Sequence, residues 1–158
     1  MADYAKSFLN GQKVDNELID LNKYTLPFCD GGDSYNDPAV KEIKSKLKSG
    51  DGIIVATPVY NYNVNSVLKN VIELTGSSWI DKPVGFLCSA GGFNSYMSIM
   101  SIANSLMLDF RCIIIPRFVY AVNSAFDEEK RTVKDEKIRL RIDQLCEKLQ
   151  KIATALKN

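Results

Sequence analysis

Histidine is absent from all 158 residues of the chain. Its absence excludes Ser-His-Asp and Cys-His nucleophilic mechanisms, histidine acid–base catalysis and metal sites that need an imidazole ligand. Cysteine is scarce as well, with four residues in the chain. They are far apart in sequence, so the chain lacks the Cys-x-x-Cys pair that is typical of zinc sites and redox dithiols. Cys88 and Cys112 lie within apolar runs, where a thiol behaves as a small buried hydrophobe. We therefore expect no metal site and a reducing, cytoplasmic setting.

Excess charge and long apolar runs are also missing. The net charge is +1, whereas a surface that binds nucleic acid normally leaves a clear basic excess. No apolar run approaches the roughly 20 residues that span a bilayer, and the N-terminus shows no signal-peptide pattern. We expect a single domain over residues 1–158, with neither a nucleic-acid nor a membrane partner.

Segments with helical and strand periodicity alternate along the chain. Asp37-Pro38 is a helix N-cap followed by proline at the first helical position, which is a strong start signal. The predicted strands are residues 52–57, 84–88 and 112–115, with a weak candidate at 14–21. The first predicted helix is the end of a helix over residues 2–9. The others run from 37 to 50, from Asn65 or Ser66 onward, over 94–108 and along the C-terminal segment. The run GIIVAT over 52–57 is apolar throughout, which is typical of a strand buried on both faces.

The C-terminal segment carries apolar residues at alternating spacings of four and three: Ile138, Ile142, Leu145, Leu149, Ile152 and Leu156. This pattern predicts a helix that covers one face of the sheet, and a dimer seam is the alternative. The alternation of strands and helices predicts an α/β fold, with a parallel sheet covered by helices on both faces. In such a sheet ligands bind beyond the carboxyl ends of the strands.

Two loops at strand ends are therefore candidate ligand sites. Residues 58–65 hold two tyrosines and three asparagines. The rings could flank a planar ligand, and the amides could bind a ring edge that has both donors and acceptors. In the alternative interpretation the asparagines only form turns. The loop Ser89–Ser95 contains Gly91-Gly92, where backbone could approach a ligand closely, although glycine after a buried strand is common.

The run GDGIIVATPVYNYNVNSVLKNVIEL resembles the signature segment of the NADPH-dependent FMN reductases: a strand, Thr-Pro-x-Tyr-Asn, then a helix with Leu-Lys-Asn. The later Asp-Lys-Pro-Val strand and the Ser-x-Gly-Gly loop match that family in kind and order, so the resemblance covers residues from about 14 to 155. It implies a flavodoxin-like three-layer fold, FMN as cofactor and NAD(P)H as hydride donor. It also implies a small electron acceptor such as a flavin, quinone, azo dye or metal oxyanion.

The same resemblance implies which residues contact the flavin. Carried over position by position, they are Pro58, Tyr60, Asn61 and Tyr62 along the ring and Ser89, Gly91 and Gly92 at its other edge. No catalytic side chain is implied, because hydride passes directly from nicotinamide to flavin.

Two features depart from the family pattern. The usual glutamate before the tyrosine is Val59, and no Gly-Ser-x-Arg segment is present. The resemblance places Met1 inside the helix that follows the family's first strand and its phosphate-binding turn, so we expect that strand and turn to be missing. Three interpretations follow: a flavin-dependent reductase, an inactive oligomeric binding protein, or a reductase shortened by a misplaced start codon. A missing central strand would leave a sheet edge open, so we expect a homodimer or higher homo-oligomer.

Overall fold

The computed structural model describes residues 1–127, 129 and 131–157. Its helices are α1 (Ala2–Gly11), α2 (Pro38–Ser49), α3 (Ser66–Thr75), α4 (Met100–Phe110) and α5 (Glu136–Leu156). Its strands are β1 (Ile53–Tyr60), β2 (Asn63–Val64), β3 (Pro83–Ala90), β4 (Ile113–Ile114), β5 (Val119–Val122), β6 (Phe126–Asp127) and β7 (Thr132–Val133). None of the described helices is both long and apolar enough to cross a membrane.

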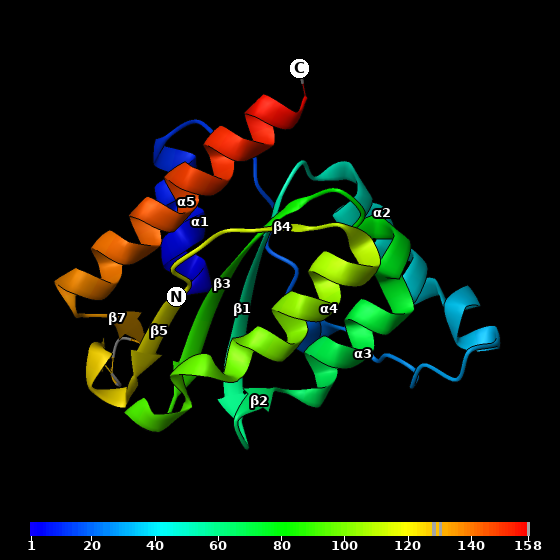
Figure 1. Cartoon of the computed structure of the whole chain (residues 1–158), viewed down its shortest axis with the longest axis horizontal. Helices are drawn as coiled ribbons and strands as arrows, with labels where there is room; N and C mark the ends of the chain where they lie inside the picture. The colour runs from blue at the N-terminus through cyan, green and yellow to red at the C-terminus, as the bar shows by residue number, and fades with distance from the viewer. Residues whose placement is uncertain (128, 130, 158) are drawn as a thin grey trace.

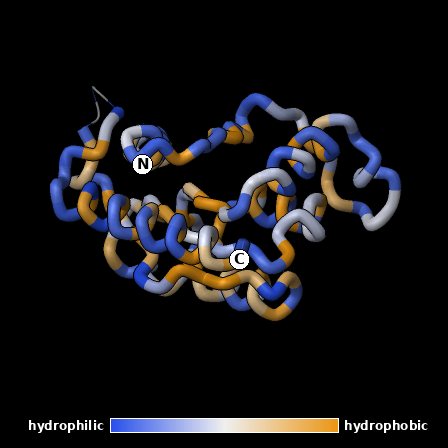
Figure 2. The backbone as a smooth tube through the Cα atoms, turned by 90° about the horizontal axis from the view of Figure 1, so that it is seen from above, coloured by the Kyte–Doolittle hydropathy of each residue, from blue (hydrophilic) through white to orange (hydrophobic). Residues whose placement is uncertain are grey.

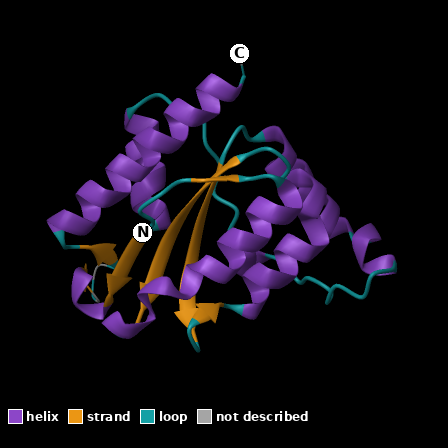
Figure 3. Ribbon diagram, viewed as in Figure 1, coloured by secondary structure: helices purple, strands orange, loops and turns teal. Residues whose placement is uncertain are grey.

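The sheet lies between two layers of helices (Figures 1 and 3). Its order is β2-β1-β3-β4, with β5 also paired to β3, and β1, β3, β4 and β5 are parallel. One apolar cluster joins the sheet to α2, α3 and α4, and a second joins it to α1 and α5. The three-layer α/β prediction is therefore confirmed, and α5 covers a sheet face as its apolar spacing predicts.

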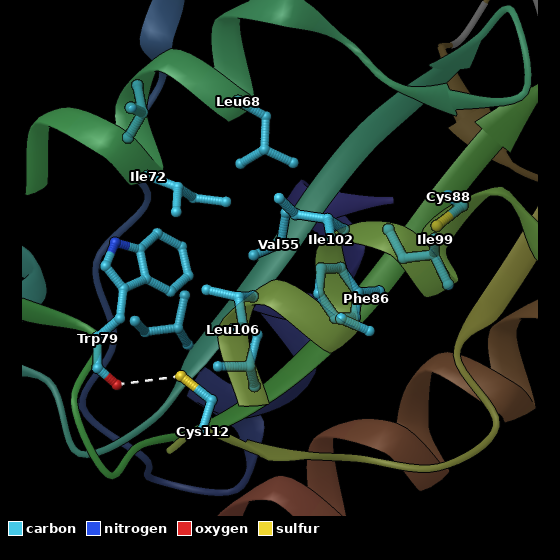
Figure 4. Close-up of a cluster of buried hydrophobic side chains, with 14 of the residues drawn as sticks. Val55, Leu68, Ile72, Trp79, Phe86, Cys88, Ile99, Ile102, Leu106 and Cys112 are labelled. Atoms are coloured by element: carbon cyan, nitrogen blue, oxygen red, sulfur yellow. Dashed lines mark hydrogen bonds between the residues drawn. The ribbon is translucent and has the colours of Figure 1, made fainter. Parts of the chain in front are cut away.

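The larger cluster fills the space between β1, β3, α3 and α4 (Figure 4). Trp79 and Phe86 are its largest side chains that are almost completely buried. The indole Nε1 of Trp79 donates a hydrogen bond to Thr75 Oγ1 at 2.9 Å, and the thiol of Cys112 donates one to the Trp79 carbonyl oxygen at 3.2 Å. Cys88 and Cys112 are both buried, which confirms the prediction that they act as small buried hydrophobic residues.

The predicted strand at residues 14–21 is wrong. The segment has no regular secondary structure up to Asp20, which caps a short 3-10 helix over Leu21–Lys23, and it pairs with no described strand. It crosses from α1 toward α2 along one side of the molecule (Figure 2). Val14 packs on the cluster of α1 and α5, whereas Ile19 packs on the other cluster. Side-chain burial, not backbone pairing, therefore holds this segment.

The prediction that β1 is buried on both faces is also wrong. Ile53, Val55 and Val59 are buried, but Ile54 is half-buried and Ala56 is exposed. Within the described residues β1 pairs with β3 on one side and, only at its last two residues, with β2 on the other. β3 has partners on both sides and is buried almost throughout. The difference arises because β1 lies at an edge and β3 lies at the centre.

Two other boundaries differ from the sequence predictions. The predicted helix over 94–108 begins as a 3-10 helix, Phe93–Ile99, and becomes α-helical only at Met100. The predicted strand 112–115 shortens to β4, and a second segment, β5, continues beside β3 after the break at Pro116 and Arg117. Proline lacks the N–H that a central strand needs, so the ladder is interrupted there.

Candidate functional site

The predicted polar loop over residues 58–65 is instead a β-hairpin. β1 continues to Tyr60, pairs antiparallel with β2, and turns through Asn61 and Tyr62. These two residues have φ values of 49° and 60°, the left-handed values that a tight two-residue hairpin turn needs. Asparagine tolerates this conformation, whereas tyrosine adopts it rarely. The hairpin leaves the side chains of Tyr60 and Tyr62 61% and 66% exposed.

Asn65 fixes the hairpin to the start of α3. Its side-chain oxygen accepts a hydrogen bond from the Leu68 backbone N–H at 2.9 Å, so Asn65 is the N-cap. Its amide nitrogen donates to Thr57 Oγ1, also at 2.9 Å. Thr57 is buried, and its hydroxyl donates to the Pro58 carbonyl oxygen at 3.1 Å. One side chain therefore joins the end of β1 to the helix that follows.

A second hydrogen bond ties the hairpin to α4. The hydroxyl of Ser101 donates to Asn63 Oδ1 at 3.0 Å, and the Val64 backbone N–H donates to the same oxygen at 2.8 Å. The hairpin is thus held at both of its ends, which restricts the positions that Tyr60 and Tyr62 can occupy.

The second candidate loop lies next to the hairpin. Parallel pairing places Pro58 beside Ser89, and Ser89 beside Ala121, so the carboxyl ends of β1, β3 and β5 meet at one edge. Ser89 belongs to β3 and not to the loop, which begins after Ala90. The structure therefore brings all seven residues of the predicted flavin site to one edge of the sheet. Their contact with a flavin remains a prediction.

Gly91 and Gly92 are exposed, and a Cβ atom added to either one would meet no atom within 4 Å. Packing within the described part of the protein therefore gives no reason for glycine at these positions. Backbone facing open space beside two exposed tyrosine rings fits a planar ligand laid against this edge. The residues present thus fit the isoalloxazine ring of FMN.

Aromatic residues from the 3-10 helix, from β5 and from the residue before β5 lie beside the glycine loop. The Tyr120 hydroxyl donates a hydrogen bond to the Gly92 carbonyl oxygen. Tyr96 contacts Tyr120 edge-on, with ring centroids 5.6 Å apart, and stacks on Phe118 at 4.9 Å. Phe93 is 76% exposed beside this loop. Phe118 and Tyr120 were missed because the strand was predicted to end at residue 115, whereas Phe93 lies in the predicted candidate loop Ser89–Ser95 and Tyr96 lies in the predicted helix over 94–108.

Cys88 is the titratable residue nearest to Ser89 in the sequence. Burial raises the pKa of its thiol to about 12, so it stays protonated at neutral pH. It therefore supplies no thiolate to this edge.

Comparison with known proteins gives the family. The family model described as NADPH-dependent FMN reductase matches residues 1–127. An NAD(P)H-dependent FAD/FMN reductase of Geobacillus thermodenitrificans is 31% identical over an alignment of 137 residues that covers 85% of this chain and 73% of that protein. An NADPH:quinone oxidoreductase of Arabidopsis thaliana is 29% identical over 94% of this chain and 78% of that protein.

Solved structures agree on the fold. The flavoenzyme NAD(P)H:(acceptor) oxidoreductase FerB of Paracoccus denitrificans has a TM-score of 0.72 at 18% identity, covering 95% of this chain and 87% of FerB. A flavodoxin from the Archaea has a TM-score of 0.65 at 11% identity, covering 97% of this chain and 87% of the flavodoxin. The fold is flavodoxin-like, and the chain belongs to the NADPH-dependent FMN reductase family, a family of flavin-using oxidoreductases.

Proposed function

We propose that this chain is a flavin-dependent reductase that passes hydride from NAD(P)H through FMN to a small acceptor such as a flavin or quinone. The observation that carries the proposal is the adjacency of Pro58 and Ser89, which places the tyrosine hairpin beside the exposed Gly91-Gly92 backbone. FMN held at this edge would supply the chemistry of hydride uptake and electron transfer to the acceptor.

The protein's own part is to bind and orient. Tyr60 and Tyr62 supply aromatic surface, and the amide of Asn61 supplies both a donor and an acceptor for a ring edge. The backbone of Gly91 and Gly92 allows close approach, and Pro58 and Ser89 form the floor at the ends of β1 and β3. No acidic or basic side chain is assigned a proton transfer.

Replacing Asn61 with glycine tests the ring site. Glycine keeps the left-handed φ of 49° and removes only the amide, whereas alanine would add backbone strain. Loss of one hydrogen bond, about 0.5–1.5 kcal/mol, is expected to weaken riboflavin binding by about twofold to tenfold without lowering the thermal midpoint. Flavin fluorescence quenching and thermal unfolding measure the two effects. Unchanged flavin binding together with a lower midpoint would show that Asn61 only shapes the turn.

We further propose that the protein is a homodimer or larger homo-oligomer. The support is the edge of β1, where Ile53–Pro58 pairs with β3 on one side and with no described strand on the other. Unpaired strand edges favour pairing with another chain, and the half-buried Ile54 adds apolar area there. A cytoplasmic setting is proposed because all four cysteines are free thiols.

Light scattering at micromolar concentration is expected to give at least twice the chain mass of 17.7 kDa. Replacing Ala56, an exposed residue of β1, with lysine should shift the protein toward the monomer, because an edge lysine opposes strand pairing. Replacing the exposed Lys151 of α5 with alanine is the control. A wild-type monomer with a sharp thermal transition would contradict the proposal.

A further inference from the structure

A cavity of about 380 Å³ lies away from the predicted ring site, between α5 and the connection that joins β4 to β5. Figure 1 shows this connection in yellow and α5 in orange to red. The cavity is lined by Tyr96, Ile115, Pro116, Arg117, Phe118, Arg141, Gln144, Leu145 and Lys148. Ile115 and Leu145 are buried and form an apolar floor. The volume is at the lower end of the range for small-molecule sites, roughly 300–1,000 Å³.

Three cations line this cavity and no acidic residue does. Arg141, Gln144 and Lys148 follow one another at helical spacing, so they share one face of α5, and Arg117 comes from the opposite wall. None of the three cations forms a hydrogen bond or ion pair within the described residues. By contrast, Arg111 pairs with Asp81 at 2.8 Å. The cavity therefore presents uncompensated positive charge over apolar surface, which is suited to an anion with an apolar part.

Arg117 holds an uncommon backbone conformation, with a φ of 61°. Left-handed φ is unfavourable for a residue with a long side chain, and such conformations cluster at ligand sites. It occurs where the strand beside β3 is broken, between Ile114 and Val119. The break thus places Arg117 in the wall of the cavity.

The aromatic wall of the cavity connects it to the ring site. Tyr96 and Phe118 line the cavity and stack on each other at 4.9 Å. Tyr96 also contacts Tyr120, whose hydroxyl donates to the Gly92 carbonyl oxygen. The cavity wall is therefore linked to the glycine loop through two side chains, Tyr96 and Tyr120.

We propose that this cavity binds the adenosine end of NADPH, with Arg117, Arg141 and Lys148 contacting its 2′-phosphate and the Tyr96–Phe118 stack contacting the adenine. The inference rests on the proposed function, because it assumes that the nicotinamide end lies at the ring site. It assigns to the cavity the preference for NADPH over NADH, which differ only in this phosphate.

Calorimetry with adenosine 2′,5′-bisphosphate, compared with adenosine 5′-monophosphate, tests the assignment without flavin or turnover. We expect the bisphosphate to bind about tenfold or more tightly, since a charge-assisted hydrogen bond changes affinity by this factor or more. Arg141→Ala and Lys148→Ala should each remove most of that difference. Both side chains are exposed, so both variants should keep the wild-type thermal midpoint.

Lys151→Ala is the matched control, because it removes one exposed cation of α5 that does not line the cavity. Equal binding of the two nucleotides, equal effects of Lys151→Ala and Lys148→Ala, or displacement of the bisphosphate by inorganic phosphate at equal affinity would each overturn the assignment. Flavin binding is measured separately. Intact flavin binding with no preference for the bisphosphate would refute only the assignment of the cavity to the 2′-phosphate. Bisphosphate binding without any flavin binding would refute only the proposed flavin site.

Discussion

FMN and riboflavin are expected to bind the 158-residue chain with dissociation constants within about a factor of ten, or 1.4 kcal/mol, of each other. The two ligands share the ring that the hairpin and the glycine loop are proposed to hold, and they differ in the phosphate. The family resemblance implies that a Ser/Arg-rich turn binds this phosphate, and no Gly-Ser-x-Arg segment occurs in these residues.

The expected loss of FMN affinity follows from the number of hydrogen bonds that its phosphate lacks in this chain. Each charge-assisted hydrogen bond to the phosphate contributes about 1.5–3 kcal/mol, so the absence of several lowers FMN affinity by orders of magnitude. Riboflavin affinity should change little. Isothermal titration of both ligands measures the ratio, and a preference for FMN of roughly hundredfold, about 2.8 kcal/mol, would show that other residues bind the phosphate.

Replacing Asn65 with alanine is expected to lower both stability and flavin affinity. The change removes the N-cap of α3, which contributes about 0.5–2 kcal/mol, and the hydrogen bond to the buried Thr57, which contributes about 1 kcal/mol. A total of about 1.5–3 kcal/mol corresponds to a thermal midpoint lower by about 3–10 °C for a chain of this size. Flavin affinity should fall as well, because Tyr60 and Tyr62 lose the anchor of their hairpin.

Asn65→Asp is the matched variant. Aspartate keeps the oxygen that caps α3 but cannot donate to Thr57 Oγ1, so its loss of stability should be smaller than that of the alanine variant. Thermal unfolding and flavin titration of the two variants separate the contribution of the N-cap of α3 from that of the hydrogen bond to Thr57 in β1. Equal midpoints for wild type and Asn65→Ala would contradict this account of the hairpin.

Most helices and the two longest strands could be predicted from sequence, because their signals are local. Asp37 and Asn65 cap helices as predicted, each accepting hydrogen bonds from the following backbone N–H groups. The apolar runs of β1 and β3 marked strands with little ambiguity. The predicted site residues also lie at one edge, since parallel strands bring their carboxyl ends together.

The features that were not predicted depend on contacts between distant parts of the chain or on unusual residues at a turn, which a local sequence pattern does not indicate. The hairpin turn was missed because Tyr62 occupies a left-handed position where glycine is the usual signal. β5 was missed because Pro116 suggested the end of a strand, whereas the chain pairs with β3 again from Val119, three residues after the proline. Residues 14–21 were predicted as a strand from composition, but a strand needs a neighbour to pair with, and none is present among the described residues.

The hairpin and the glycine loop are proposed to hold a flavin for reduction by a nicotinamide. Anaerobic mixing of the protein with FMN and NADPH, monitored by the visible absorbance of the flavin, measures this reaction. We expect bleaching much faster than in buffer without protein, slower bleaching with Asn61→Gly, and a rate that rises with FMN concentration until the site is saturated. Bleaching no faster than in buffer at saturating FMN would contradict the proposal.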